Sequence, residues 1–67
     1  MRYQLFNEPM GPQSEPTKPV AEADTIHPLL IIMAKMGADL ILSGAFFELV
    51  IHDTNDNTVY LRVRGNN

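Results

Sequence analysis

Residues 46–64, FFELVIHDTNDNTVYLRVR, indicate the fold more clearly than any other part of this 67-residue chain. Two runs, residues 46–52 and 58–64, are rich in Val, Ile, Leu and aromatic side chains, which favour β-strands. The residues between the runs, DTNDN, include Asp and Asn, which tolerate the left-handed backbone conformations of tight turns. The stretch therefore predicts a C-terminal β-hairpin.

Side chains alternate between the two faces of a strand, so this hairpin should have one apolar face and one polar face. Keeping the apolar sets of both strands on one side requires a connecting loop with an odd number of residues. This register places Glu48 across from Arg62 or Arg64, where opposite charges favour the pairing. The apolar face would consist of Phe47, Leu49, Ile51, Val59, Leu61 and Val63.

A helix is predicted to begin near Thr25. Asp24 or Thr25 can cap its N-terminus by accepting hydrogen bonds from unpaired backbone N–H groups, and Pro28 is tolerated in a first turn. Residues 26–36 carry apolar side chains on nearly every face, so we expect the helix to be buried nearly all round.

The C-terminal end of this helix has two alternatives. Gly37 could adopt the left-handed conformation that ends a helix, which would leave residues 38–42 as a strand. Alternatively, the helix continues to Leu42 and stops at Gly44. We favour the longer helix because β-branched residues are sparse after Gly37.

The N-terminal part, residues 1–25, is predicted to hold a short strand at residues 2–7 followed by a Pro-rich arm. Residues 8–24 contain four prolines and almost no large apolar side chain, which is typical of an extended segment. The arm is either a tail or a strap that crosses onto a partner subunit. Residues 26–67 would form the core of helix and hairpin.

These elements predict an α+β fold, in which one apolar helix packs on a small antiparallel sheet and residues 2–7 add an edge strand. One sheet cannot cover a helix that is apolar on all sides, so we expect a homodimer, formed by pairing helices or by joining sheets edge to edge. The residues expected in the helix-mediated dimer interface are Leu29, Ile31, Ile32, Met33 and Met36.

Residue sets that perform catalysis or bind metals are not evident, and no enzyme activity, cofactor or metal is expected. The chain has no cysteine and two histidines, and its glycines do not follow the spacing of a phosphate-binding loop. Ser14 and Ser43 are not framed as nucleophiles. The DTNDN turn resembles the opening of a calcium loop, but Thr58 and Arg64 replace the required glycine and glutamate.

The polar face of the hairpin has the character of a binding surface, because Tyr and Arg are enriched at interface hot spots. The residues assigned to partner binding are Tyr60, Arg62, Arg64 and His52. We therefore expect a small non-catalytic regulator or inhibitor that binds a protein partner, of the kind that phages and mobile elements encode. The alternative is a nucleic-acid-binding regulatory dimer that places Arg62 and Arg64 against a groove.

The formal net charge of −3 disfavours binding to nucleic-acid phosphates. The apolar region between Ile26 and Ile51 is interrupted by charged residues, Pro and Gly, so no membrane span is expected. The absence of cysteine and of a visible signal peptide favours the cytoplasm.

One part of the chain resembles a known family. Leu29-Leu30 followed by residues 34–42, AKMGADLIL, is similar to the helix-to-strand passage in the N-terminal domain of type IV pilus and type II secretion ATPases, and residues 62–65, RVRG, resemble a later strand end. Ala38 and Ile41 stand where that family has a serine and a histidine, and no nucleotide-binding loop is present. The resemblance implies a stand-alone piece or mimic of that domain without ATPase activity, with the shorter helix.

Overall fold

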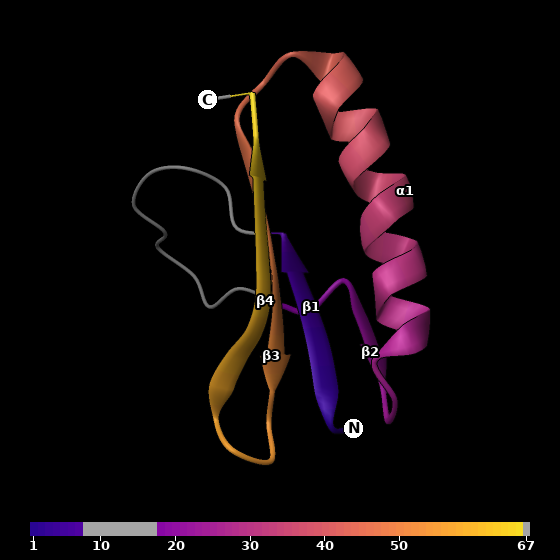
Figure 1. Ribbon diagram of the computed structural model, residues 1–67, viewed down its shortest axis with the longest axis vertical. Helices are drawn as coiled ribbons and strands as arrows, with labels where there is room; N and C mark the ends of the chain where they lie inside the picture. Colours follow the sequence, from indigo (N-terminus) through magenta and orange to yellow (C-terminus); the bar gives the residue numbers. More distant parts are fainter. Residues whose placement is uncertain (8–17, 67) are drawn as a thin grey trace.

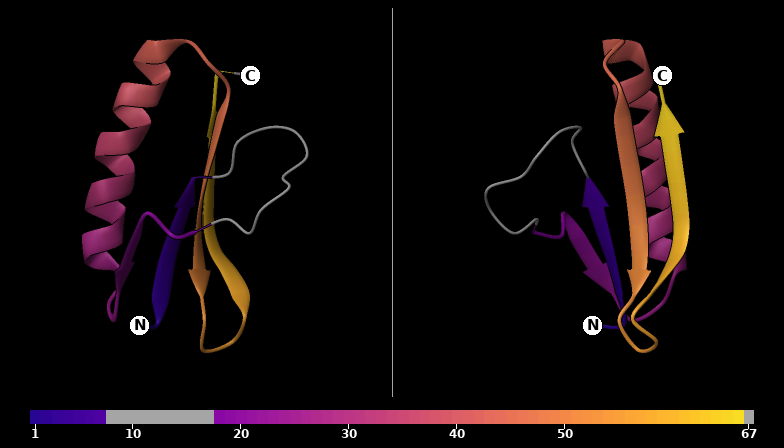
Figure 2. Two further views of the ribbon diagram at one scale, coloured as in Figure 1. Left: turned by 180° about the vertical axis from the view of Figure 1, so that it is seen from behind. Right: turned by 90° about the vertical axis from the view of Figure 1, so that its left-hand side faces the viewer.

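The computed structural model describes residues 1–7 and 18–66, which form one helix and a four-stranded sheet (Figure 1). The order along the chain is β1 (Tyr3–Asn7), β2 (Ala21–Ala23), α1 (His27–Ser43), β3 (Phe47–Asp53) and β4 (Thr58–Gly65). The strands are antiparallel in the order β2-β1-β3-β4, and α1 lies along one face of the sheet (Figure 2). The predicted α+β fold, with one helix on an antiparallel sheet and a C-terminal hairpin, is confirmed.

Strand β1 lies inside the sheet, which corrects the prediction that it forms an edge. It pairs with β2 on one side and with β3 on the other, so that Leu5 is opposite both Ala21 and Ile51. The edge beside β1 is occupied by β2, a strand at the end of the segment expected to be an extended arm. The rest of that arm, residues 8–17, lies outside the described residues.

The N-terminal end of β1 is fixed to the turn between β3 and β4. The backbone N–H of Thr54 donates to the carbonyl oxygen of Arg2 at 2.7 Å, and the Thr54 hydroxyl donates to the same oxygen at 2.8 Å. The Arg2 guanidinium donates to both carboxylate oxygens of Asp53, at 3.4 and 3.2 Å. Asp53 Oδ1 also accepts from the N–H of Asn55 at 3.0 Å, which stabilises the start of the turn.

The β3–β4 hairpin has the predicted pairing at its open end, where Glu48 is opposite Arg64. The prediction that the connecting loop has an odd number of residues is wrong, because residues 54–57 connect the strands and their number is even. A β-bulge restores the register: Ile51 pairs with Leu61 and His52 pairs with Val59, so Tyr60 is the extra residue. Beyond the bulge, Leu61 and Val63 still face the core.

Helix α1 extends to Ser43, as the longer alternative predicted, and ends at Gly44 in the left-handed conformation (φ 81°). Residues 38–42 are therefore helical, and the strand implied there by the shorter helix does not form. The start is corrected: the N-cap residue is Ile26 and has no side-chain cap, so neither Asp24 nor Thr25 has this role. Ile26 instead packs its side chain against the core, and its carbonyl accepts from Leu29 and Leu30.

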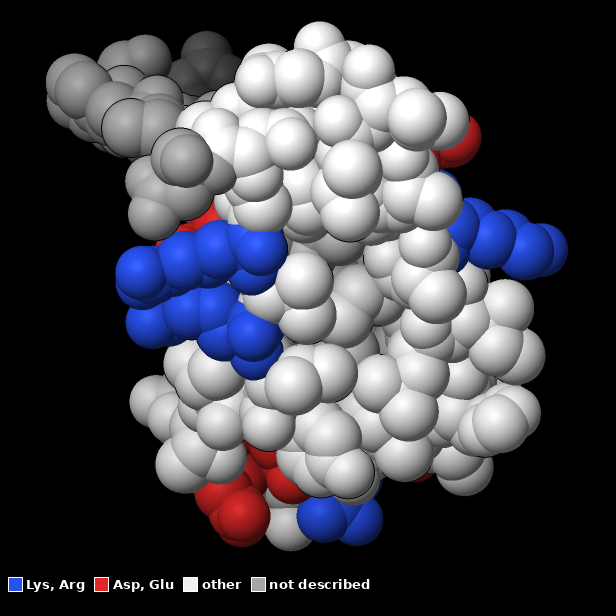
Figure 3. All heavy atoms as spheres, turned by 45° about the horizontal axis from the view of Figure 1, so that its top comes forward, with Lys and Arg blue, Asp and Glu red and all other residues white. Residues whose placement is uncertain are grey.

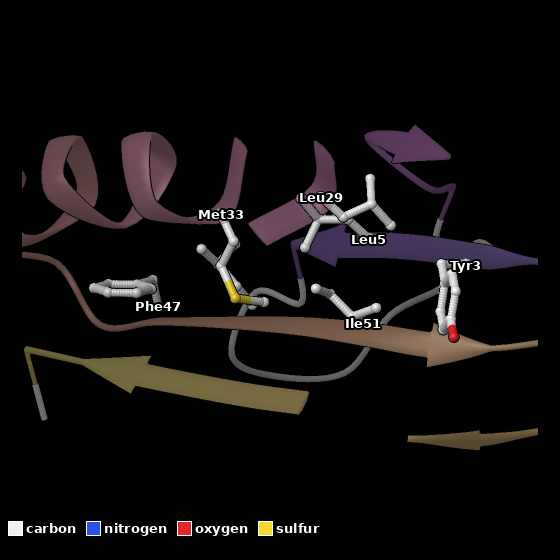
Figure 4. Packing of buried hydrophobic residues seen from close by; sticks show 7 residues of the cluster. Tyr3, Leu5, Leu29, Met33, Phe47 and Ile51 are labelled. Atoms are coloured by element: carbon white, nitrogen blue, oxygen red, sulfur yellow. The ribbon is translucent and has the colours of Figure 1, made fainter. Parts of the chain in front are cut away.

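The core lies between one face of α1 and the sheet, as Figure 4 shows. Leu29 and Met33 are 0% and 5% exposed and contact the inward side chains of β1 and β3. Several apolar residues on the opposite side of α1 are exposed, so the expectation of a helix buried nearly all round is wrong for a single copy. The buried apolar cluster consists of Tyr3, Leu5, Leu29, Met33, Phe47, Leu49 and Ile51.

The end of β4 is joined to the helix by Asn66. Its side-chain amide donates to the carbonyl oxygens of Leu40, Ile41 and Ala45 at 2.8, 3.2 and 3.0 Å. These groups lie at or just beyond the C-terminus of α1, where carbonyl oxygens lack partners within the helix. Asn66 has a φ of 60°, which asparagine tolerates better than most residues.

Replacing Gly65 with alanine should destabilise the fold, because a Cβ there would collide with the ring of Phe47, its partner across the strands. Phe47 is only 3% exposed and has little room to move, so we expect a loss of about 1–3 kcal/mol in the free energy of unfolding. Gly37→Ala is the matched control: a Cβ there meets no atom within 4 Å, and the change should stabilise the helix by about 0.4–1 kcal/mol. Urea unfolding measures both, and equal effects of the two variants would contradict this packing.

The contact between Arg2 and Asp53 should make stability depend on pH. The hydrogen bond from Arg2 lowers the pKa of Asp53 below its usual value, more than burial raises it. A carboxyl whose pKa is lowered by folding stabilises the protein above its unfolded-state pKa, about 3.9, and this stabilisation is lost as the pH falls through the folded-state pKa. Asp53→Asn should therefore be less stable than the parent protein at pH 7, and the difference should shrink below about pH 4.

Thermal unfolding of both proteins between neutral and acidic pH measures this difference. In a protein that also carries Arg2→Ala, the Asp53→Asn change should cost less stability at pH 7, because the hydrogen bond from Arg2 is the largest cause of the pKa shift of Asp53. A constant difference between the parent protein and Asp53→Asn at every pH would count against this role of the ion pair.

Candidate functional site

The face of the sheet opposite α1, called here the outer face, carries most of the side chains predicted to bind a partner. Strand pairing places Val50 between Phe6 of β1 and Arg62 of β4. The pairs Glu48–Arg64 and His52–Val59 lie on the same face, because these residues are an even number of positions from Val50 or are paired with such a residue. The outer face consists of Gln4, Phe6, Glu22, Glu48, Val50, His52, Val59, Arg62 and Arg64.

Two arginines of β4 share one carboxylate of β3. Arg64 Nε donates to Glu48 Oε2 at 2.6 Å, and Arg62 Nε lies 3.5 Å from Glu48 Oε1. The Glu48 side chain is 16% exposed, whereas those of Arg62 and Arg64 are 46% and 57% exposed. Both contacts use Nε, and within residues 1–7 and 18–66 the terminal amino groups of the two guanidinium groups make no hydrogen bond, so they are suited to acceptors on another molecule.

This arrangement gives the arginine pair a local excess of one positive charge and a defined orientation. Residues two apart on one strand are about 7 Å apart, so Arg62 and Arg64 present two planar donor groups at that spacing. A guanidinium group can donate two parallel hydrogen bonds to one carboxylate, which adds geometric specificity to the charge. The surface is therefore suited to a ligand with more than one acidic group.

Aromatic and apolar side chains lie beside the arginines. The rings of Phe6 and His52 are in edge-to-face contact, with centroids 5.0 Å apart. Val50 is fully buried although it is on the outer face, and Val59 is 46% exposed. Gln4 donates to Glu22 at 2.9 Å near the β2 edge of the face. Phe6 was not predicted as a site residue. Its position next to the apolar Leu5 in the first strand indicated that it faces away from the core, because successive residues of a strand point to opposite faces.

Tyr60 is separated from the arginines, which corrects the prediction that Tyr60, Arg62 and Arg64 share a face. Its ring is in edge-to-face contact with Tyr3, a member of the core cluster on the helix side, with centroids 5.6 Å apart. The bulge is the cause, because the extra residue shifts the alternation of β4 before Leu61. For the same reason Val59, expected on the core side, pairs with His52 on the outer face.

The residues predicted for a dimer interface fall into two groups. Leu29 and Met33 are inside the core of one copy, so their assignment to an interface is corrected. Ile32 and Met36 are partly buried and pack against that core. Ile31 is 46% exposed on the side of α1 away from the sheet. Other exposed apolar residues of this side, including Ile41 and Leu42, were missed because the helix was expected to be covered all round.

The surface at the C-terminal end of α1 has little charge. Figure 3, in which this end of the molecule is turned forward, shows a wide area without Lys, Arg, Asp or Glu, with charged side chains at its margins. Leu42 is 86% exposed and Ile41 is 56% exposed in the last turn of α1. The protein therefore has two candidate contact surfaces, on opposite sides of the sheet and helix layers.

The residues tested for catalysis or metal binding have structural contacts or lie outside the described chain. The Ser43 hydroxyl donates to the carbonyl of Leu40 at 2.6 Å, and Ser14 is not among the described residues. Within residues 1–7 and 18–66, no group of three His, Asp or Glu is placed to hold a metal ion. No helix in that part of the chain combines the length and apolar character needed to cross a membrane. Comparisons with protein-family models, curated proteins and solved structures found no match.

A double-mutant cycle between Glu48 and Arg64 should give a favourable coupling of about 0.2–1 kcal/mol, because the pair joins neighbouring strands at the protein surface. The variants are Glu48→Gln, Arg64→Gln and their combination, and urea unfolding gives the free energies. The same cycle with Arg62 should give a smaller coupling, since its contact is longer. Both couplings should fall as salt is added. A zero coupling for Arg64 at low salt would show that the ion pair does not stabilise the hairpin.

Proposed function

We propose that this protein is a non-catalytic, cytoplasmic regulator or inhibitor that binds an acidic segment of a larger protein through the outer face of its sheet. The observation that supports the proposal best is the arginine pair, in which Glu48 holds Arg62 and Arg64 side by side on the exposed strand β4. A partner's carboxylates would accept hydrogen bonds from the terminal amino groups of both arginines.

The surroundings of the arginines also favour a protein ligand. Phe6 and Val59 supply apolar area next to the charges, and interfaces between proteins combine such apolar centres with arginine anchors. Glu48 reduces the affinity of this surface for a phosphate backbone, because it neutralises part of the positive charge. The formal net charge of −3 acts in the same direction.

Replacing both arginines, Arg62→Gln with Arg64→Gln, should abolish or strongly reduce partner binding. The loss of one anchoring arginine typically costs about 2 kcal/mol, which corresponds to an increase in Kd of about 30-fold. The tagged protein is first used to capture its partner from a native lysate of the organism that encodes it, and mass spectrometry identifies the partner. Binding of the purified partner to each variant is then measured by calorimetry.

The two arginine changes, Arg62→Gln and Arg64→Gln, are also tested one at a time. Lys18→Gln is the control for each of them, since it removes one positive charge from another exposed position. It should leave binding unchanged, and the circular dichroism spectra of all variants should match. If the double arginine variant binds the partner as tightly as the unmodified protein does, the partner must bind to another surface. Recovery of nucleic acid alone, with an affinity that falls steeply as salt is added, would favour the alternative of a nucleic-acid-binding regulator.

A further inference from the structure

One side of α1 exposes apolar side chains along almost its whole length, and this side faces away from the sheet. Leu30, Ile31, Ile41 and Leu42 are 36%, 46%, 56% and 86% exposed. Ala34 and Ala38 are exposed between them. At 3.6 residues per turn these six residues occupy one continuous strip of the helix surface, called here the helix stripe.

We propose that the helix stripe is the binding site for the helix stripe of a second copy of this chain, with the two helices antiparallel about a two-fold axis near residue 36. This proposal goes beyond the proposed function, because it concerns the opposite side of the molecule and does not depend on Arg62 or Arg64. Three properties of the stripe support a second copy as its occupant: the order of side-chain sizes, the position of its flanking charges and its exposure in a small domain.

The order of side-chain sizes is the same in both directions from residue 36. In an antiparallel two-fold pair, residues at equal distances on either side of the axis lie opposite each other. Leu30 is then opposite Leu42 of the second copy, and Ile31 is opposite Ile41. Ala34 is opposite Ala38, so the small side chains meet at the centre, where the helices must approach most closely.

The flanking charges are also self-complementary. Lys35 and Asp39 are exposed on the same flank of the stripe, one turn apart, and neither has an ion-pair partner among the described residues. An antiparallel two-fold pair brings the same flanks of both helices together. Lys35 would then be only about 3 Å along the axis from Asp39 of the second copy, within reach of an ion pair. The pair would occur twice, once on each side of the axis.

A parallel arrangement lacks this match, because it brings the charged flank of one helix against the uncharged flank of the other. The exposure of the stripe gives a further reason for pairing. A domain of 67 residues buries a smaller share of its surface on folding than a larger domain does, and the core of one copy uses one face of α1. Burial of the stripe in a second copy would remove its most exposed large apolar residues from water.

Charge reversal tests this orientation. Each single variant, K35D or D39K, would place like charges together at both ends of its own dimer, and we expect its Kd to rise about tenfold or more. An equimolar mixture of K35D and D39K should recover dimers, because each reversed charge meets an opposite charge on the other chain. Sedimentation equilibrium gives the affinities, native mass spectrometry identifies the mixed dimer, and circular dichroism checks that every variant is folded. The mixture also separates contact between chains from effects within one helix.

Leu42→Gln tests the apolar contact. Leu42 is 86% exposed in one copy, so the change should weaken the dimer without unfolding the chain, whereas Val59→Gln on the outer face of the sheet should leave the dimer unchanged. The proposal is overturned if the unmodified protein is a folded monomer at micromolar concentrations. It is also overturned if mixing K35D with D39K recovers no dimers, or if a dimer forms that none of the stripe variants weakens. The last result would favour the other predicted arrangement, in which sheets join edge to edge.

Discussion

The side chains of β3 and β4 must alternate in phase, because a slip of one residue would exchange the core face of β4 with its outer face. An even number of residues connects the two strands, and this connection alone would give the wrong phase. The bulge at Tyr60 adds the missing residue, so that Leu61 and Val63 reach the core while Arg62 and Arg64 reach the outer face. The core and the candidate binding surface therefore depend on the same bulge. The packing of the core and the ion pairs of the outer face both favour one register between β3 and β4.

Local patterns in the sequence were sufficient for the elements whose signals come from neighbouring residues. The turn chemistry of DTNDN and the alternation on both sides of it predicted the hairpin, with Glu48 opposite Arg62 or Arg64, and the structure has Arg64 there. The sparse β-branched residues after Gly37 favoured the longer helix, which ends at Gly44. The central position of β1 could not be predicted, because its pairing with β3 joins residues far apart in the chain. The bulge was missed because alternation is uniform on both sides of it. The contacts of Asn66 with the helix end depend on how β4 and α1 meet in space.

The two candidate surfaces differ in chemistry and lie on opposite sides of a thin molecule. The outer face orients charged groups through an ion pair, whereas the helix stripe is apolar with charges only along one flank. Two copies joined through their helices would form four layers, with the sheets outside and both arginine pairs facing solvent. Such a dimer would present two equivalent binding faces pointing in opposite directions, so a partner with repeated acidic segments could be bound more tightly through avidity.

The position of β1 also has a consequence for the order in which the chain can fold during synthesis. Strand β1 is made before α1, whereas β3, its partner toward the centre of the sheet, follows the whole of α1. Tyr3 and Leu5 must therefore remain without most of their final contacts while the helix is made. Closing this long loop costs entropy before the strands can pair, and contacts between distant residues slow folding. The β3–β4 hairpin is made after α1 and completes the sheet, so this fold gains most of its stability only once β3 and β4 have been made.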